Sequence, residues 1–301
     1  MPVTDEVWRL DTEEDADCLF FQKMSDHGHY GKLSKGKSRQ GTYVFTPDGE
    51  FLASINDLSA DRTLAMIERG LKKWEQLPDS RKQAKPSKSI KPRHRWEQFY
   101  PRDGLVLNIY SRDLPESADP AIRLATRNRD TAWFSKSEVA TMIPAAAKAG
   151  DTFEFPSAFV QRMLGFHFVD CVKGQTEPFS KSQTASSRIA GEVTRLDDQN
   201  IELTLSGKTL GRVERGRFPR GVRTDLMGRA VFDKKSRSFS EFEMVAVGER
   251  WGRTRFNGRH RQLDATPIGF VFQLAPPDAT ASIPGIIWAY NAPWLEGPKH
   301  E

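Results

Sequence analysis

The sequence lacks the motifs that identify the common enzyme classes. Its 301 residues contain no GxSxG nucleophile elbow, no HExxH zinc motif and no Walker-type glycine loop. Such motifs place a nucleophile, a pair of metal ligands or a phosphate-binding backbone within a few residues, so their absence removes the usual sequence evidence for several enzyme classes. The sequence therefore leaves open whether the protein is an enzyme and which cofactor, if any, it uses.

Cysteines and long apolar runs are also scarce. The only cysteines are Cys18 and Cys171, and the absence of CxxC excludes the usual local dithiol redox centre. No stretch approaches the roughly 18 consecutive apolar residues that span a bilayer. The first residues have neither the basic nor the apolar region of an export signal. We therefore expect a soluble cytoplasmic protein with two reduced thiols and no membrane span.

The chain does have the composition of a folded globular protein, with 38% hydrophobic and 28% charged residues. Its net charge of +5 is uneven, since residues 1–78 carry −4 and residues 79–95 carry +6. The second segment, DSRKQAKPSKSIKPRHR, contains two prolines and one large apolar residue, which is typical of an extended linker. We therefore divide the chain into an α/β module (1–78), a basic linker (79–95) and a β-rich domain (96–301).

The N-terminal module contains a hairpin with a strong turn signal. The apolar runs 42–45 and 51–53 flank Thr-Pro-Asp-Gly, in which Pro47 presets φ and Gly49 tolerates a positive φ. This arrangement predicts a β-hairpin.

Two helices are predicted around that hairpin. Residues 12–24 begin with acidic side chains and continue with apolar ones, as a helix does. After the hairpin, Ser59 or Asp61 is a suitable N-cap for a second helix. Helical spacing places four apolar side chains on one face of that second helix, and we expect this face to be buried: Leu64, Ile67, Leu71 and Trp74.

The order of helix, basic loop, hairpin and helix resembles the second half of the thioredoxin fold. The segment TYVFTPDGEFLASIN and the helix after it are similar to the strand, turn, strand and last helix of that family, and the resemblance covers roughly residues 8–77. The family's CxxC is absent, since only Cys18 lies in the first predicted helix, and Gln40-Gly41 stands where the family has a cis-proline. The resemblance implies a degenerate thioredoxin-like module without thioredoxin redox chemistry.

The remaining residues indicate an antiparallel β domain with short helices, so the fold class is α+β. A strand is predicted over 105–110, a capped helix beginning at Ser135, and a second short helix that ends at Gly165. From Phe166 onward we expect β structure, with His167 on a strand. Hairpins are predicted over 188–206 and 225–247, with a last strand over 268–274. Consecutive hairpins favour a curved sheet or a partly closed barrel.

One candidate metal or thiol site lies in the N-terminal module. His27 and His29 form an HxH pair, and Cys18 is near them in the sequence, so a thiolate and two imidazoles could bind zinc or copper. The alternative interpretations are a polar loop closed by two glycines and simple thiol chemistry at Cys18.

A second candidate site consists of two arginine-rich loops, ERGRFPRGVR (214–223) and ERWGRTRFNGRHR (249–261). Arginine beside aromatic rings can bind phosphate or stack on bases and sugars. If both loops meet at one rim of the sheet, they form an anion-binding site; the alternative is solvated turns whose arginines pair with nearby acids. The candidate ligand-binding residues are Arg215, Arg217, Arg220, Trp251, Arg253 and Arg255.

Three functions remain open from these observations. The first is a non-enzymatic binding or adaptor protein whose β domain holds a small anionic or amphipathic ligand, or a protein partner. The second is a metal-binding or thiol-redox protein that uses Cys18, His27 and His29. The third is a nucleic-acid-associated protein that uses the linker and the arginine loops.

Overall fold

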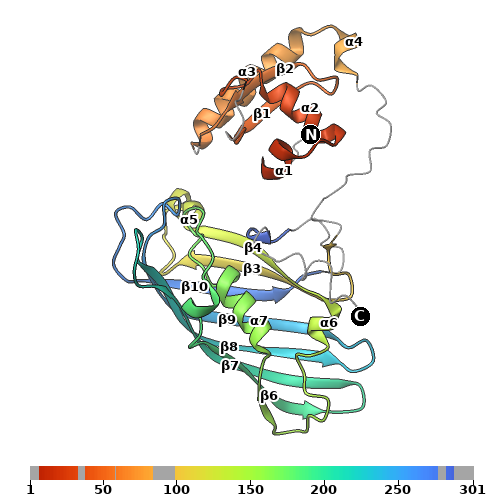
Figure 1. Ribbon diagram of the computed structural model, residues 1–301, viewed down its shortest axis with the longest axis vertical. Helices are drawn as coiled ribbons and strands as arrows, with labels where there is room; N and C mark the ends of the chain where they lie inside the picture. The colour runs from red at the N-terminus through yellow and green to blue at the C-terminus, as the bar shows by residue number, and fades with distance from the viewer. Residues whose placement is uncertain (1–6, 33–37, 58, 84–98, 277–282, 288–301) are drawn as a thin grey trace. The chain divides into compact units, whose positions relative to one another are not determined.

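The computed structural model describes residues 7–32, 38–57, 59–83, 99–276 and 283–287 (Figure 1). The chain divides into two compact units, residues 1–95 and residues 96–301. Most of the predicted linker lies outside the described residues. Its first residues form a helical turn, α4 (Asp79–Lys82), in which Arg81 pairs with Asp48 at 2.8 Å and with Glu50 at 2.8 Å. The start of the predicted linker therefore belongs to the first unit.

The first unit is a two-stranded hairpin with helices around it. The predicted hairpin is confirmed: β1 (Thr42–Phe45) pairs antiparallel with β2 (Phe51–Ile55), and Gly49 in the turn has a φ of 94°. The helix predicted over 12–24 is in part wrong, because two helices occupy this region, α1 (Val7–Thr12) and α2 (Ala16–Ser25). Asp15 separates them, since its carboxylate accepts hydrogen bonds from the first backbone N–H groups of α2.

The long helix α3 (Ala60–Gln76) is confirmed with its Ser59 cap, but its expected buried face is wrong in part. Leu64 and Leu71 are 56% and 50% exposed, whereas Met66 and Gly70 are buried. A Cβ at Gly70 would lie 3.0 Å from Val44 Cγ1, so this glycine lets the helix approach β1 closely. The close approach centres the contact on Gly70 and turns the two leucines outward.

The second unit is built on an open sheet of eight antiparallel strands in the order β4-β3-β10-β9-β8-β7-β6-β5 (Figure 1). The predicted strands and hairpins are confirmed, and the fold is α+β. The sheet has two edge strands among the described residues, so it is open rather than closed into a barrel. The strands are β3 (Leu105–Asp113), β4 (Arg127–Phe134), β5 (Thr152–Glu154), β6 (Arg188–Leu196), β7 (Asn200–Val213), β8 (Arg220–Asp233), β9 (Ser238–Gly252) and β10 (Thr266–Leu274).

Short helices connect the early strands. The predicted capping box is present in α6 (Lys136–Val139), while α5 (Pro120–Ala125) joins β3 to β4. The second predicted helix does not end at Gly165: α7 (Ser157–Arg162) continues as a π-helical turn, Met163–His167. The prediction that His167 lies on a strand is therefore wrong. A 3₁₀ turn (Lys181–Gln183) completes the described helical elements of this unit.

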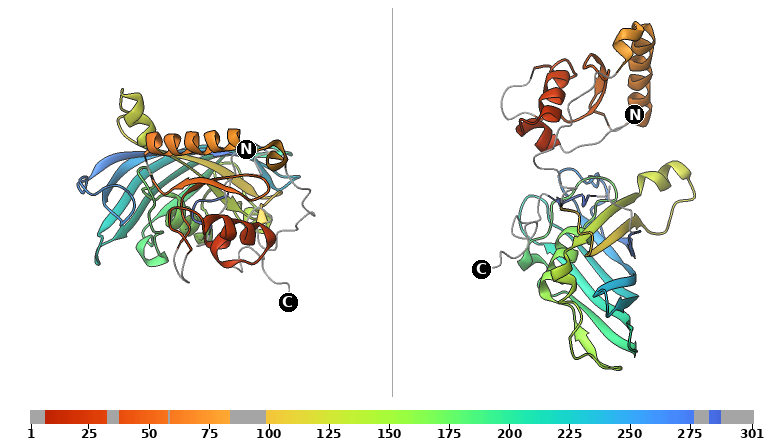
Figure 2. Two further views of the ribbon diagram at one scale, coloured as in Figure 1. Left: turned by 90° about the horizontal axis from the view of Figure 1, so that it is seen from above. Right: turned by 90° about the vertical axis from the view of Figure 1, so that its right-hand side faces the viewer.

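The main core lies between one face of the sheet and the helices α6 and α7, which cover that face (Figures 1 and 2). Alternate residues of each strand point into it, as Leu107, Phe272 and Met244 do, and all three are fully buried. Phe168, just after the π-helical turn, stacks on Phe272 with ring centroids 4.8 Å apart. A smaller apolar cluster covers part of the other face: Val106, Trp133, Ala275 and Ile287. None of the described helices is both long enough and apolar enough to cross a bilayer.

Candidate functional site

The two arginine-rich loops lie at the same end of the sheet. One connects β7 to β8 and the other connects β9 to β10, and β8 pairs with β9 so that Arg220 is opposite Gly252. In an antiparallel meander every second connection falls at the same end, so this placement follows from the strand order. We call the residues 214–220 and 251–256 the arginine rim.

The arginines of the rim contact aromatic rings. The guanidinium carbons of Arg217 and Arg253 lie 5.2 and 5.1 Å from the centroid of the same ring, Phe218. Arg255 lies 5.0 Å from the ring of Phe256. These distances are typical of cation–π contacts, which hold a guanidinium in place without neutralising its charge. The two loops therefore meet at Phe218, where two cations converge.

Most arginines of the rim have no acidic partner. Within the described part of the chain, no ion pair joins a carboxylate to Arg215, Arg217, Arg253 or Arg255. Glu214 at the rim already pairs with Arg212 at 3.1 Å. The interpretation that the loop arginines pair with nearby acids therefore fails for these four arginines. It holds for four others of the two loops: Arg220, Arg223, Arg250 and Arg259.

The other two predicted ligand-binding residues have structural contacts. Arg220 donates a hydrogen bond to the carbonyl of Glu177 at 3.1 Å and lies 5.3 Å from the ring of Phe179. Burial lowers the pKa of Arg220, and the charge of Glu177 opposes this shift. Trp251 packs across Gly221, where a Cβ would lie only 2.0 Å from the indole ring. Within the rim, Arg220 and Trp251 therefore have structural contacts, whereas the guanidinium groups of Arg217 and Arg253 lie against the Phe218 ring and remain without an acidic partner among the described residues.

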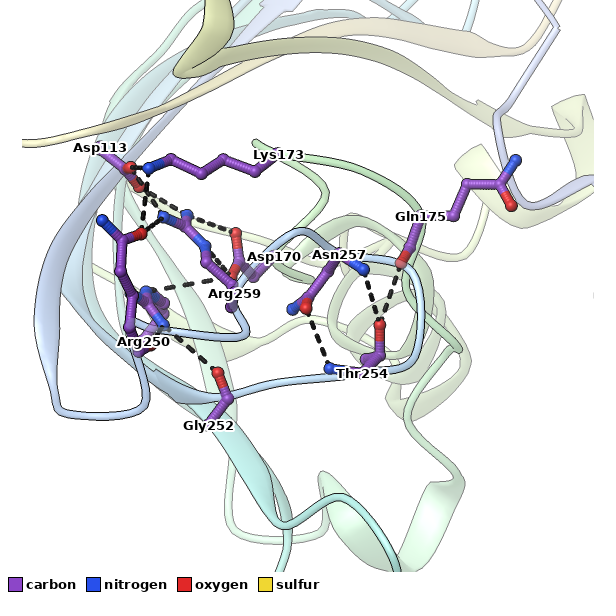
Figure 3. A network of polar contacts seen from close by, with 10 residues as sticks. Asp113, Asp170, Lys173, Gln175, Arg250, Gly252, Thr254, Asn257 and Arg259 are labelled. Carbon is purple, nitrogen blue, oxygen red and sulfur yellow. Dashed lines mark hydrogen bonds and ion pairs between the residues drawn. The ribbon is translucent and has the colours of Figure 1, made fainter. Parts of the chain in front are cut away.

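A buried ionic network fixes the β9–β10 loop (Figure 3). The guanidinium of Arg259, with 1% of its side chain exposed, donates two hydrogen bonds to Asp170 (2.8 and 2.9 Å) and two to Asp113 (2.6 and 2.8 Å). Burial alone would lower the pKa of Arg259, but the hydrogen bonds and charges of the two carboxylates outweigh it and raise the pKa. Arg259 therefore stays charged and joins this loop to β3 and to the segment that follows the π-helical turn.

The rest of the loop is held by a hydrogen-bonded turn (Figure 3). The Asn257 side chain accepts a hydrogen bond from the Thr254 backbone N–H at 3.0 Å, and the Thr254 hydroxyl donates to the Gln175 carbonyl at 3.0 Å. Both Thr254 and Asn257 are buried. These bonds fix the backbone on both sides of Arg255, so the β9–β10 part of the rim is preorganised.

A cavity of about 560 Å³ borders the rim. Two of its lining residues, Phe256 and Glu177, also contact rim arginines. Its wall also has three uncharged polar residues and three charged ones: Asn128, Gln175, Thr176, Arg129, Asp130 and Glu177. Its size lies within the roughly 300–1,000 Å³ of small-molecule sites. The cavity therefore has room for the uncharged part of a ligand whose charged group contacts the rim.

Asp130 and His167, which sequence reasoning did not select, form a buried pair beside this cavity. His167 Nδ1 lies 2.8 Å from one Asp130 carboxylate oxygen, and the Gly285 backbone N–H donates to the other at 2.7 Å. Burial raises the pKa of Asp130, but the charge and hydrogen bond of His167, together with backbone donors, outweigh it and lower the pKa. Because Asp130 is on β4 and accepts the hydrogen bond from Gly285, it holds residues 283–287 against this strand.

Cys171 lines the same cavity, but its thiol is poorly ionised. Desolvation, with a smaller contribution from the charge of Asp130, raises its pKa to about 12. A nucleophilic cysteine needs the opposite shift, since the thiolate is the reactive form. Cys171 is therefore suited to packing rather than to thiol catalysis.

This assignment predicts slow alkylation of Cys171 by iodoacetamide at pH 8 in the folded protein. Relative to a thiol of pKa 9.0, a pKa of about 12 lowers the thiolate fraction by about 1,000-fold. Peptide mass spectrometry after timed quenching distinguishes Cys171 from Cys18, and the same reaction in denaturant gives the unperturbed rate. Labelling of Cys171 at equal rates in the two conditions would contradict the assignment.

The predicted metal ligands are not brought together. Cys18 is buried in α2 and its thiol donates to the Asp15 carboxylate at 3.3 Å. Both ring nitrogens of His29 are already in hydrogen-bond contact, with the Ser54 hydroxyl at 2.9 Å and the Gln40 carbonyl at 3.1 Å. Among the described residues, no group of three or more His, Cys, Asp or Glu side chains is placed to hold a metal ion. The HxH loop instead connects α2 to the hairpin.

Comparison with known proteins assigns no family to this chain. No protein-family model, no curated protein and no solved structure matches it. The functional conclusion therefore depends on the residues and geometry of the rim and its cavity.

Proposed function

We propose that this is a binding protein for a small organic anion, with the charged group of the ligand held at the arginine rim. The observation that carries the proposal is the convergence of Arg217 and Arg253 on Phe218, with no carboxylate partner in the part of the chain that the structure describes. Two guanidinium groups in fixed positions suit a phosphate or carboxylate, because such groups accept several charge-assisted hydrogen bonds. The cavity beside Phe256 takes the uncharged part of the ligand.

The proposal requires that binding depend on the negative charge of the ligand. We expect 1-naphthyl phosphate to bind the full untagged chain with saturable affinity at low salt, and its uncharged counterpart 1-naphthol to bind at least about tenfold more weakly, since a single charge-assisted contact is worth about 1.5–3 kcal/mol. Titration calorimetry of both compounds measures the difference. Equal affinities, or no saturable binding of the phosphate, would contradict the proposal.

Single-stranded nucleic acid is the second candidate, because arginines beside exposed aromatic rings also bind its backbone and bases; Phe256 is 59% exposed. The dependence of affinity on salt distinguishes the two ligands. A protein that contacts many phosphates releases many counterions, so log K falls steeply with log salt concentration, whereas a single anionic group gives a shallow slope. A steep slope with an oligonucleotide, together with no binding of 1-naphthyl phosphate, would favour nucleic acid.

A further inference from the structure

The sheet face opposite α6 and α7 carries an exposed apolar row. Tyr110 on β3, Val271 on β10, Val245 on β9 and Met227 on β8 are direct neighbours in the strand register, so their side chains point to the same face. Tyr110, Val245 and Met227 are 41%, 44% and 72% exposed. An apolar row across four strands is more than the isolated apolar side chains that a protein surface usually has.

This row has a groove at one end and a protruding side chain at the other. The groove, about 370 Å³, lies over β3, β10 and β9, and its lining includes Tyr110, Leu114 and Val247. Gly269 contributes no side chain there, and the Leu114 side chain packs over it, 3.1 Å from where a Cβ would lie. Met227, two strands beyond β10, is the most exposed large apolar side chain of the described residues. The face thus has both a protruding side chain, Met227, and a groove.

We propose that this face docks onto the same face of a second copy of the chain, around a two-fold axis that runs parallel to the strands between β10 and β9. This operation exchanges β3 with β8 and β10 with β9. It places Met227 of one protomer over Tyr110 and the groove of its partner, and Val271 over the partner's Val245. A two-fold interface requires such self-complementarity, since the same patch serves both protomers.

Two charges directly beside the apolar row, Arg112 and Asp225, are complementary under this axis. In the next row of the sheet, Arg112 on β3, Gly269 on β10, Val247 on β9 and Asp225 on β8 are consecutive neighbours. The same rotation brings Arg112 opposite the partner's Asp225 and Gly269 opposite the partner's Val247. Each Val247 therefore meets Gly269 and the Leu114 side chain that packs beside it, and each Arg112 meets a carboxylate. One strand further out, the rotation places Arg127 on β4 opposite the partner's Lys208 on β7, so the attraction in this row is confined to Arg112 and Asp225.

The intramolecular partners of these two charges leave them accessible. Asp225 has 78% of its side chain exposed, and its ion pair among the described residues is with Lys208, at 3.5 Å and itself 88% exposed. Arg112 has 45% of its side chain exposed and contacts Glu116 at 3.0 Å. Exposed pairs of this kind contribute little to the stability of the monomer, so their ions can contact a second chain at low cost.

The open face is wide and long enough for a standard interface. Eight strands about 4.8 Å apart give a sheet about 34 Å wide, and nine-residue strands such as β3 and β10 are about 30 Å long. An interface that buries about 800 Å² on each partner is about 28 Å on a side if it is square. Stacked sheets pack about 10 Å apart, and interdigitated Met, Val and Tyr side chains fill the space between them.

The test is the oligomeric state of the full chain, measured by sedimentation velocity across a range of concentrations. We expect a dimer of the 34.1 kDa chain. Met227→Lys should raise the dimer dissociation constant at least about tenfold, because it places a charge in the apolar row. Leu196→Lys is the matched control: it removes an apolar side chain that is 36% exposed on β6, outside the row, and should leave the dimer intact.

A charge exchange makes the test specific for the axis. Asp225→Arg should dissociate the dimer by placing two arginines opposite each other, and Arg112→Asp added to it should restore the dimer. Circular dichroism shows whether each variant is folded. A wild-type monomer at every concentration would overturn the proposal, as would a dimer insensitive to Met227→Lys or a folded double variant that remains monomeric.

Discussion

Replacement of Arg259 by methionine is expected to lower the free energy of unfolding by about 3 kcal/mol, the lower end of the range for a broken buried ion pair, because it removes the cation that donates four short hydrogen bonds to the buried Asp170 and the partly exposed Asp113. The cations that remain, Arg250 and Lys173, lie 3.9 Å from Asp170 and 3.7 Å from Asp113. Asp170 is 7% exposed, and Asp113 receives both of its shortest hydrogen bonds from Arg259. Since folded domains are typically stable by only about 5–15 kcal/mol, the loss is a large share of the total. Urea denaturation monitored by circular dichroism measures it.

The matched control is Arg223→Met, which removes an arginine from an exposed ion pair with Glu249. The side chain of Arg223 is 67% exposed and that of Glu249 is 46% exposed. This change should cost at most about 1 kcal/mol. Adding Asp113→Asn and Asp170→Asn to Arg259→Met should recover part of the loss, because the two carboxylate charges that Arg259 neutralised are then removed. An Arg259→Met variant as stable as Arg223→Met would contradict the role assigned to the buried network.

The second large effect concerns binding. The double variant Arg217→Ala, Arg253→Ala is expected to bind 1-naphthyl phosphate about 100-fold more weakly than the wild type. Each arginine supplies one charge-assisted contact to the ligand. On a solvent-exposed rim we assign each contact about 1.4 kcal/mol, near the lower end of the usual range, which corresponds to a tenfold change in Kd. Arg217 is exposed, and Arg253 is half-buried with a contact to His260 Nδ1 at 2.6 Å; neither has an ion-pair partner among the described residues, so their removal should change stability little.

Arg223→Ala is the control for this effect as well, because Arg223 also lies on β8 near the rim but is paired with Glu249 at 2.8 Å. It changes the net charge of the protein by one and should weaken binding by no more than about twofold, through long-range electrostatics alone. Calorimetric titration of the three proteins at one salt concentration gives the comparison. A similar loss in Arg223→Ala and in the double variant would show that overall charge, rather than the rim, determines affinity.

The elements with local signals were predictable from the sequence. The hairpin at Pro47-Asp48-Gly49, the Ser59 cap and the Ser135 capping box all depend on contacts within four residues, and all are present. From the sequence, an anion-binding site is expected only if the two arginine loops meet at one rim of the sheet. The meander order of the strands places both loops at the same end. Propensity and turn chemistry act over short distances, which is why these features appear in the sequence itself.

The features missed by sequence reasoning depend on contacts between distant residues. The sequence does not distinguish Arg259 from the other arginines of its loop, because its partner Asp113 is 146 residues away and no local pattern links the two. The buried face of α3 was misjudged since it is set by the close approach of Gly70 to Val44 on another element. The HxH loop resembled a metal site, yet His29 satisfies both ring nitrogens through Ser54 and Gln40.

The measurement that tests the central claim most directly is an NMR titration of the ¹⁵N-labelled full chain with 1-naphthyl phosphate, observed at the arginine side-chain Nε–H signals. The signals of Arg217 and Arg253, assigned from the two single alanine variants, should shift together and saturate at one ligand per chain, while that of Arg223 stays in place. Saturating shifts confined to other residues, with Arg217 and Arg253 unmoved, would contradict the arginine rim as the ligand site.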